Sequence, residues 1–184
     1  AHGTNVTTTV GGNDTATNGT VDAITGSTNG TYGTVACTGT GAGANCTYTP
    51  NAGFSGADSY TYTICLAAPN ADICDTATVD VVVGPDAQDD TASTPRNTPV
   101  SRDVSGNDKY QPGSTFSVVG TPVNGSVVMN PDGTYTFTPD AGFTGTATFD
   151  YQICLPAPNG AVCDTATVTV SVGVVAIDAV NDAP

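Results

Sequence analysis

Basic residues are nearly missing from this chain of 184 residues, which has three Lys and Arg against 17 acidic residues and a formal net charge of −14. Every acidic residue is Asp, and both Glu and Trp are absent. A surface this acidic repels phosphate backbones, which argues against a nucleic-acid partner. Asp without Glu is typical of turns and of oxygen-rich ion sites, and it is unfavourable for helices.

Side chains that carry out catalysis are equally scarce. The single histidine, His2, lies in an N-terminal tail, and the single lysine, Lys109, lies in a predicted turn. No Gly-x-Ser-x-Gly, His-Glu-x-x-His or phosphate-binding motif occurs, and the Asp residues have no companion base. We therefore expect no enzymatic activity. No run of 18 apolar residues is present either, so we expect no membrane span.

A long internal repeat is the strongest positive feature. Residues 49–83 return 89 positions later as residues 138–172, with 21 of 35 positions identical and no gap. Such self-similarity indicates a tandem array of one supersecondary unit. We predict a first repeat at residues 1–84, a second at 85–173, and a final segment, 174–184, that belongs to a junction or to the next repeat or subunit.

The six cysteines form three pairs, each spaced nine positions apart: Cys37/Cys46, Cys65/Cys74 and Cys154/Cys163. An even number at equal spacing on turn-linked strands favours disulfides and an oxidising compartment. Six cysteines allow about 15 connectivities. We favour the three local pairs, because the last two occupy equivalent places in the two repeats.

Period-two patterns predict strands in both repeats. Residues 58–66 alternate with Tyr60, Tyr62 and Ile64 on one face, and residues 75–83 alternate with Ala77, Val79, Val81 and Val83 inward. Between them we expect a loop closed by cysteines, and before them a corner that buries Phe54. Near the start, a short strand at 21–24 is followed by a predicted loop at 25–30. About seven short strands a repeat predict an all-β sandwich.

Several sequence blocks together resemble the bacterial cadherin-like and Ig-like repeats of large extracellular adhesins and surface proteins. They are DAVNDAP, the Gly-Asn-Asp corner of each repeat, YTFTPDAGFTGTATFDYQI and CDTATVTVSV, and they cover nearly the whole chain twice. The resemblance implies two tandem Ig-like or cadherin-like β-sandwiches, exported by a bacterium to the cell surface or beyond. It also implies calcium at the junctions between repeats.

Two junctions carry the candidate calcium ligands. These are Asp86, Asp89 and Asp90 between the repeats, with Asn107 and Asp108 of the Gly-Asn-Asp corner if that corner folds against the junction, and Asp178, Asn181 and Asp182 at the end. Calcium takes six to eight oxygen ligands, several of them anionic, at about 2.3–2.6 Å. Clustered carboxylates repel one another unless a cation lies among them. The alternative is that these residues only make turns and solvate a linker.

The phase of the repeat leaves two interpretations open. The second repeat starts with residues 86–95, no equivalent precedes Val6, and a similar segment lies at 174–184. Either the chain is a slice of a longer array, or its last segment completes the first repeat of an identical subunit by strand addition. We predict a structural role, with neighbouring repeats or identical subunits as partners. The alternative is a module whose exposed loops bind a surface glycan or protein, with the tyrosines as a platform for a sugar.

Overall fold

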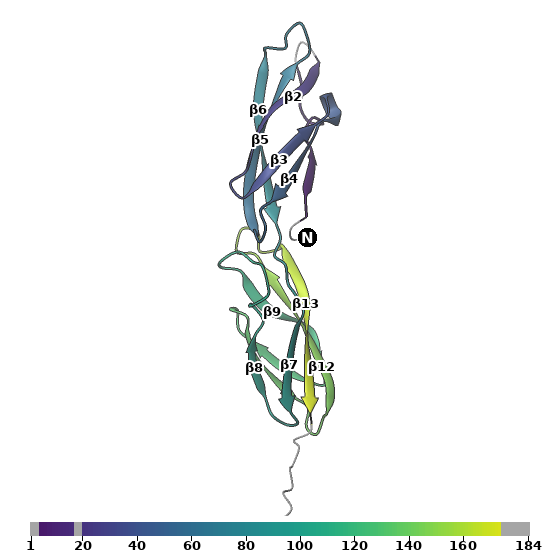
Figure 1. Cartoon of the computed structure of the whole chain (residues 1–184), viewed down its shortest axis with the longest axis vertical. Helices are drawn as coiled ribbons and strands as arrows, with labels where there is room; N and C mark the ends of the chain where they lie inside the picture. Colours follow the sequence, from purple (N-terminus) through teal and green to yellow (C-terminus); the bar gives the residue numbers. More distant parts are fainter. Residues whose placement is uncertain (1–3, 17–19, 174–184) are drawn as a thin grey trace, which may run out of the picture. The chain divides into compact units, whose positions relative to one another are not determined.

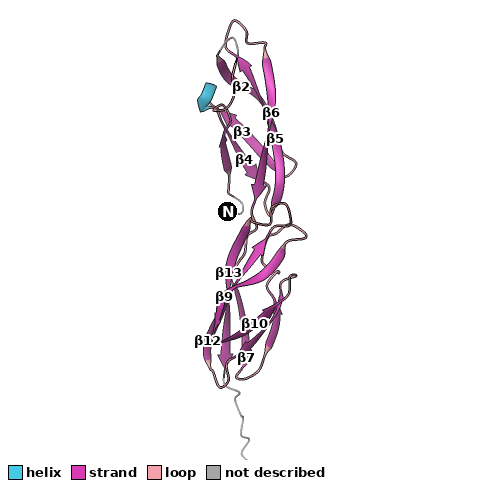
Figure 2. Ribbon diagram, turned by 180° about the vertical axis from the view of Figure 1, so that it is seen from behind, coloured by secondary structure: helices cyan, strands magenta, loops and turns pink. Residues whose placement is uncertain are grey.

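The computed structural model describes residues 4–16 and 20–173. Two compact units make up the chain, unit 1 at residues 1–84 and unit 2 at residues 85–184. Strands dominate both units (Figure 2), and the one helical element in the described part is a 3₁₀ turn, η1 (Gly41–Gly43). No helix within these ranges is long and apolar enough to cross a membrane. The all-β class predicted from the sequence is therefore confirmed.

Unit 1 packs two three-stranded sheets against each other (Figure 1). One sheet has the order β1-β4-β3 and the other β2-β5-β6, with neighbouring strands antiparallel. The strands are β1 (Val6–Thr9), β2 (Val21–Thr28), β3 (Gly33–Thr38), β4 (Asn45–Pro50), β5 (Gly56–Leu66) and β6 (Cys74–Val83). The core between the sheets is centred on the buried rings of Tyr48, Tyr60 and Tyr62.

Unit 2 repeats this plan with one additional strand. Its sheets have the orders β10-β11-β8 and β7-β13-β12-β9. The strands are β7 (Asp90–Pro95), β8 (Val100–Asp103), β9 (Thr115–Val123), β10 (Gly125–Met129), β11 (Thr134–Pro139), β12 (Gly145–Cys154) and β13 (Cys163–Gly173). Strand β7 runs parallel to β13 over six residue pairs, from Asp90 beside Val168 to Pro95 beside Gly173 (Figure 1). It has no counterpart among the described residues of unit 1.

Alternating side chains explain how the central strands of unit 2 pack. In β12, Ala147, Phe149, Tyr151 and Ile153 are all buried, and in β13 Ala166, Val168, Val170 and Val172 are buried beside them. Each strand therefore turns one face to the core and one to solvent, as the period-two pattern predicts. Phe149 also contacts the rings of Tyr135 and Phe137 from the opposite sheet.

Unit 1 follows the same pattern less completely. Tyr60, Tyr62, Val81 and Val83 are buried, whereas Ile64, Ala77 and Val79 keep part of their surface in solvent. Phe54, expected to be buried, is half-buried and stacks on the exposed ring of Tyr32 at 4.6 Å between centroids.

The second strand of unit 1 is longer than its composition suggests. The sequence predicts a strand ending at residue 24 and a loop from 25 to 30, but β2 continues to Thr28 and pairs with β5 through two register shifts. Pairing with the neighbouring strand overrides the weak strand propensity of Gly26 and Ser27. The loop prediction was wrong over these residues.

Three disulfides join the cysteines in the pairs favoured by their spacing. Cys37–Cys46 links β3 to β4, Cys65–Cys74 links β5 to β6, and Cys154–Cys163 links β12 to β13. Each pair lies directly opposite across two antiparallel strands, with Cα atoms 4.0–4.1 Å apart. The bridges therefore close hairpins. Disulfides of this kind persist in oxidising compartments, which supports an extracellular protein.

Candidate functional site

The candidate site lies in unit 2, where residues 86–90 lead into β7, whose first residue is Asp90. We call this segment the strap. Its first residue, Asp86, forms a two-way backbone bridge with Lys109: Asp86 N lies 2.8 Å from Lys109 O, and Lys109 N lies 3.0 Å from Asp86 O. The Gly-Asn-Asp corner that precedes Lys109 therefore folds against the strap, which is the condition that a calcium site made of these residues requires.

Two carboxylates of unit 2 hold the strap by accepting its backbone N–H groups. Ala87 N donates to Asp164 Oδ2 at 3.0 Å, and Gln88 N donates to Asp108 Oδ1 at 2.8 Å. Ala87 itself belongs to the buried core of the unit. Hydrogen bonds to ionised acceptors are roughly twice as strong as those between neutral groups. The strap is thus a packed and bonded part of the fold.

The hydroxyl of Tyr151 lies at the centre of the site and has more acceptors around it than protons to donate. Its oxygen lies 2.9 Å from Gln88 O, 3.0 Å from both carboxylate oxygens of Asp108, and 3.2 Å from Asp90 Oδ2. A phenol has one proton and can serve one acceptor at a time. Two carboxylates and a carbonyl therefore compete for one donor, and an added proton or cation would relieve that competition.

The crowding of these groups contributes to the shifts of their pKa values. Burial raises the pKa of Asp108, and the charges of Asp90 and Asp86 raise it further, against the hydrogen bonds from Gln88 and Tyr151. Burial likewise raises the pKa of Asp90, together with the charge of Asp89. Burial and the two carboxylates raise the pKa of Tyr151 well above its ordinary range, so the phenol stays protonated.

The predicted calcium ligands separate into two groups in the structure. Asp90 and Asp108 converge on Tyr151, whereas Asp89 turns outward, where its Oδ1 accepts the backbone N–H of Thr167 at 2.8 Å. Asn107 donates to the backbone oxygen of Asp89 at 3.2 Å. Within residues 4–16 and 20–173, no three acidic, His or Cys side chains are arranged to hold a metal ion. The remaining candidates, Asp178, Asn181 and Asp182, lie outside the described residues.

Sequence reasoning missed two of the residues that organise this site, Tyr151 and Asp164. The internal repeat contains a signal for both, because Tyr62 and Asp75 occupy the equivalent positions of the first copy. A polar residue retained in both copies on the inward-facing side of a strand indicates a shared hydrogen bond, and that comparison would have identified them.

Unit 1 has the same tyrosine and carboxylate without the strap. Tyr62 Oη lies 3.0 and 3.1 Å from the two carboxylate oxygens of Asp14 and 3.2 Å from Val10 O. Burial, followed by the hydrogen bond and charge of Asp14, raises the pKa of Tyr62 to about 12. No described residue of unit 1 stands where Gln88 and Asp90 stand in unit 2.

A second carboxylate in unit 1 has the opposite electrostatic character. Asp58 accepts hydrogen bonds from the backbone N–H of Thr31, Tyr32 and Ser59 and from the hydroxyl of Tyr48 at 2.6 Å. Burial by itself raises the pKa of Asp58, but these four donors outweigh it and lower the pKa below the ordinary value. Asp58 is thus a well-satisfied acceptor that fixes the turn before β3.

Among solved structures, the chain is similar to the endo-fucoidan hydrolase MfFcnA4 from glycoside hydrolase family 107, at 12% identity and a TM-score of 0.36. That similarity covers 86% of this chain and 24% of the hydrolase, so the chain spans about a quarter of that protein. It is also similar to chicken VE-cadherin EC1-2, at 14% identity and a TM-score of 0.35, over 84% of this chain and 89% of that one. No curated protein matches the sequence.

The family assignment rests on the sequence itself. The bacterial Ig domain family matches the chain twice, at residues 1–82 and 83–171, which together cover nearly all of it. The two matches follow the internal repeat and coincide closely with the two compact units. The predicted resemblance to tandem Ig-like repeats is confirmed: the chain belongs to the bacterial Ig domain family and consists of two such domains in tandem.

Proposed function

We propose that this chain is a structural segment of an extracellular bacterial adhesin or surface fibre, and that it carries tension between the neighbouring repeats or subunits. The observation behind this proposal is the parallel pairing of β7 with β13 in unit 2. These are the first and last described strands of that unit, so tension along the chain acts on the start of β7 and on the end of β13.

The direction of pairing decides how tension acts on the hydrogen bonds. In a parallel pair, pulling the start of one strand away from the end of the other slides the strands along each other. All six residue pairs, Asp90/Val168 to Pro95/Gly173, then resist together. In unit 1 the first described strand, β1, pairs with β4, and the last, β6, pairs with β5. Tension there pulls on two different sheets.

The tyrosines favour this structural role over the alternative of a glycan-binding module. Five of the seven are buried in the cores: Tyr48, Tyr60, Tyr62, Tyr135 and Tyr151. Tyr110 is half-buried, and Tyr32 alone is largely exposed, at 50%, with one face covered by Phe54. A sugar platform needs exposed aromatic faces, and most tyrosines of this chain have their faces covered by core packing.

Single-molecule stretching of the full chain tests the proposal. Two unfolding events are expected, and the event assigned to unit 2 should require the larger force, because forced unfolding is governed by the unfolding barrier. The same force for both units, or a smaller force for unit 2, would remove the mechanical role of the β7–β13 pair.

Two adjacent proline substitutions in β7 provide a matched control. Ala92→Pro and Ser93→Pro alter neighbouring residues of an edge strand, and alternate residues of such a strand direct their N–H groups toward the partner strand. One substitution therefore removes a hydrogen bond to β13 and the other does not. We expect only one of the two to lower the unfolding force of unit 2, with the force of unit 1 unchanged in both.

Calcium at the strap is a second part of the proposal. Asp90, Asp108 and the carbonyl of Gln88 are oxygen donors that already converge on Tyr151, and water would have to complete the coordination that calcium prefers. Calorimetric titration of the chain with calcium should give saturable heat. The double variant Asp89→Ala/Asp90→Ala should lose it, and the exposed pair Asp22→Ala/Asp80→Ala should keep it. A parent chain without calcium heat would exclude the metal.

A further inference from the structure

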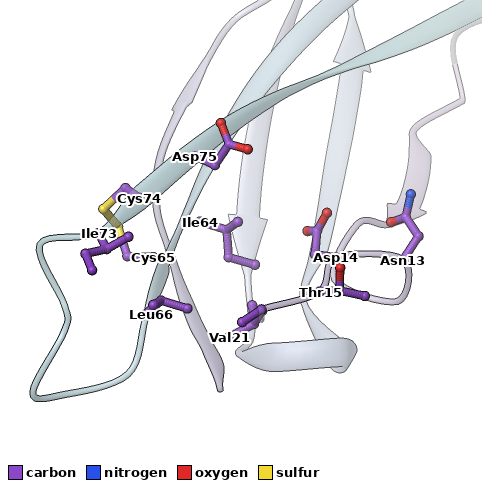
Figure 3. Close-up of a pocket in the computed structure, with 11 residues that line it drawn as sticks. Asn13, Asp14, Thr15, Val21, Ile64, Cys65, Leu66, Ile73, Cys74 and Asp75 are labelled. Carbon is purple, nitrogen blue, oxygen red and sulfur yellow. A yellow bond between two sulfur atoms is a disulfide. The ribbon is translucent and has the colours of Figure 1, made fainter. Parts of the chain in front are cut away.

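A groove in unit 1 lies where unit 2 has its strap. It has a volume of about 430 Å³ and runs between the Cys65–Cys74 disulfide and the Asp14 corner. Figure 3 shows Ile64 and Val21 lying between these two ends, with Asp75 above them. The groove thus has an apolar middle and a carboxylate at Asp14 and at Asp75.

Both carboxylates have counterparts that bind backbone N–H groups in unit 2. Asp75 is equivalent to Asp164, which accepts from Ala87, and Asp14 is equivalent to Asp108, which accepts from Gln88. In the described part of unit 1, Asp75 accepts only the N–H of its neighbour Thr76, at 2.8 Å. Asp14 accepts only from the hydroxyl of Tyr62 within the same ranges.

The groove continues into an open sheet edge. In unit 2, β13 has β12 on one side and β7 on the other. In unit 1, β6 pairs with β5 and has no second partner among the described residues. The inward side chains there are less covered as a result: Val79 is half-buried, whereas its equivalent, Val168, is completely buried. An extended segment that filled the groove and then paired with β6 would complete unit 1.

The sequence of the chain contains one further segment of the required type. Residues 174–184 read VVAIDAVNDAP, in which Asp178-Ala179 matches Asp86-Ala87 of the strap and Asn181-Asp182 matches Asp89-Asp90. Ala179 is therefore the counterpart of Ala87, whose N–H donates to a carboxylate. Asp182 is the counterpart of Asp90, which lies beside the tyrosine hydroxyl. Val180 in place of Gln88 costs no backbone contact, because Gln88 binds the site through its main-chain N and O.

We propose that the groove and the β6 edge of unit 1 bind residues 174–184 of a second copy of this chain. In this complex the N–H of Ala179 donates to Asp75, the N–H of Val180 donates to Asp14, and Asp182 lies beside the hydroxyl of Tyr62. The inference rests on the proposed structural role and names the partner in it. Because donor and acceptor are different surfaces, the contact joins copies head to tail and does not close on itself.

Peptide binding tests the site directly. The probe is a labelled peptide of residues 174–184, and its partner is the chain shortened to end at Gly173, followed by fluorescence anisotropy. We expect saturable binding at one peptide per chain. Asp75→Ala should weaken it by about tenfold or more, the loss expected for a hydrogen bond to a charged acceptor. Asp22→Ala, which removes an exposed carboxylate from β2 at the opposite edge of the same sheet, should leave affinity unchanged.

Unit 2 supplies the second control. Asp164 is the equivalent of Asp75 in unit 2, where the strap already occupies the site. Asp164→Ala therefore removes the same carboxylate there that Asp75→Ala removes from the groove of unit 1. Peptide affinity unaffected by Asp164→Ala supports binding to unit 1, whereas a tenfold loss would place the peptide in unit 2 and overturn the proposal. Circular dichroism melting of each variant establishes that the loss of binding is not a loss of fold.

Self-association of the full chain is the matching measurement. Sedimentation velocity over a concentration series should show open-ended oligomers for the full chain and a monomer for the chain ending at Gly173. A full chain that stays monomeric, with no peptide binding, overturns the inference, while the stretching experiment still decides the mechanical role. If a peptide of residues 85–95 binds the groove and that of 174–184 does not, the second copy is not the partner.

Discussion

The two units are copies of one sequence, yet they differ in how completely their cores are closed. Unit 2 has 14 residues in its buried core cluster, and unit 1 has eight among its described residues. The difference follows the strap and β7: Ala87 is itself a core residue, and Ala92 packs against that core. The comparison shows that such a domain depends on the segment that enters it as well as on its own repeat.

The largest expected effect is on the free energy of unfolding when equivalent isoleucines of the two cores are replaced by alanine. Ile153 is completely buried, whereas Ile64 keeps part of its surface in solvent. Ile153→Ala should lower the free energy of unfolding of unit 2 by about 2–5 kcal/mol, since it leaves a cavity. Ile64→Ala should cost unit 1 about 1–2 kcal/mol, because part of that side chain is already hydrated.

Urea unfolding of the chain ending at Gly173 measures both effects, and each variant identifies the transition that belongs to its unit. Shortening the chain removes the segment proposed to fill unit 1 of another copy. Equal losses in the two units would mean that their cores are equally closed, and the comparison would fail.

The two buried tyrosine hydroxyls give a second test with smaller effects. Tyr151→Phe removes the side-chain donor to Asp108, a residue that is only 6% exposed, and should destabilise unit 2 by about 1–3 kcal/mol. Tyr62→Phe should cost unit 1 about 0.5–1 kcal/mol, because the half-buried Asp14 can be hydrated instead. The midpoints of the same urea transitions report both. A larger loss for Tyr62→Phe would mean that the open groove protects Asp14 from water.

Much of the architecture could be predicted, because it depends on patterns that lie along the sequence. The repeat, the period-two alternation around Tyr60 and its equivalent Phe149, and the nine-residue cysteine spacing are local signals. Strand β2 was predicted too short because Gly26, Ser27 and Thr28 pair with β5, a contact that the local sequence does not reveal. The parallel pairing of β7 with β13 joins residues more than 70 positions apart and has no local signal.

The candidate site was predicted only in part for a related reason. The sequence places Asp86, Asp89 and Asp90 close together, and it indicates a corner at Asn107 and Asp108. It does not show which carboxylates turn inward, since that depends on Tyr151 and on the backbone N–H groups of the strap. Asp108 is therefore a buried acceptor and Asp90 a half-buried one beside Tyr151, whereas Asp89 caps the N–H of Thr167.

The smallest expected effect is a difference between the two units in how their stability changes with pH. The ordinary pKa of an Asp carboxyl is 3.8, and those of Asp90 and Asp108 are raised above it in the folded protein. A folded state that binds protons more readily than the unfolded chain gains stability as pH falls. Unit 2 should therefore become more stable as pH falls through the raised pKa values toward 3.8. Asp58 has a lowered pKa, so its contribution to unit 1 is complete above 3.8 and is lost below it.

The measurement is urea unfolding of the chain ending at Gly173, between about pH 3 and 7 at fixed ionic strength. It compares how the stabilities of the two units change with pH. Relief of the net charge of −14 on acidification stabilises both units, so the informative quantity is the gap between their transitions. The gap should widen in favour of unit 2 as pH falls to about 4, and Asp108→Asn should reduce the widening. Below that pH, Asp58→Asn should remove part of the acid sensitivity of unit 1. A gap that stays constant with pH would show that folding does not raise the pKa values of the crowded carboxylates at Tyr151. A gap that narrows as pH falls would indicate a cation bound between them, because protons would then displace that cation.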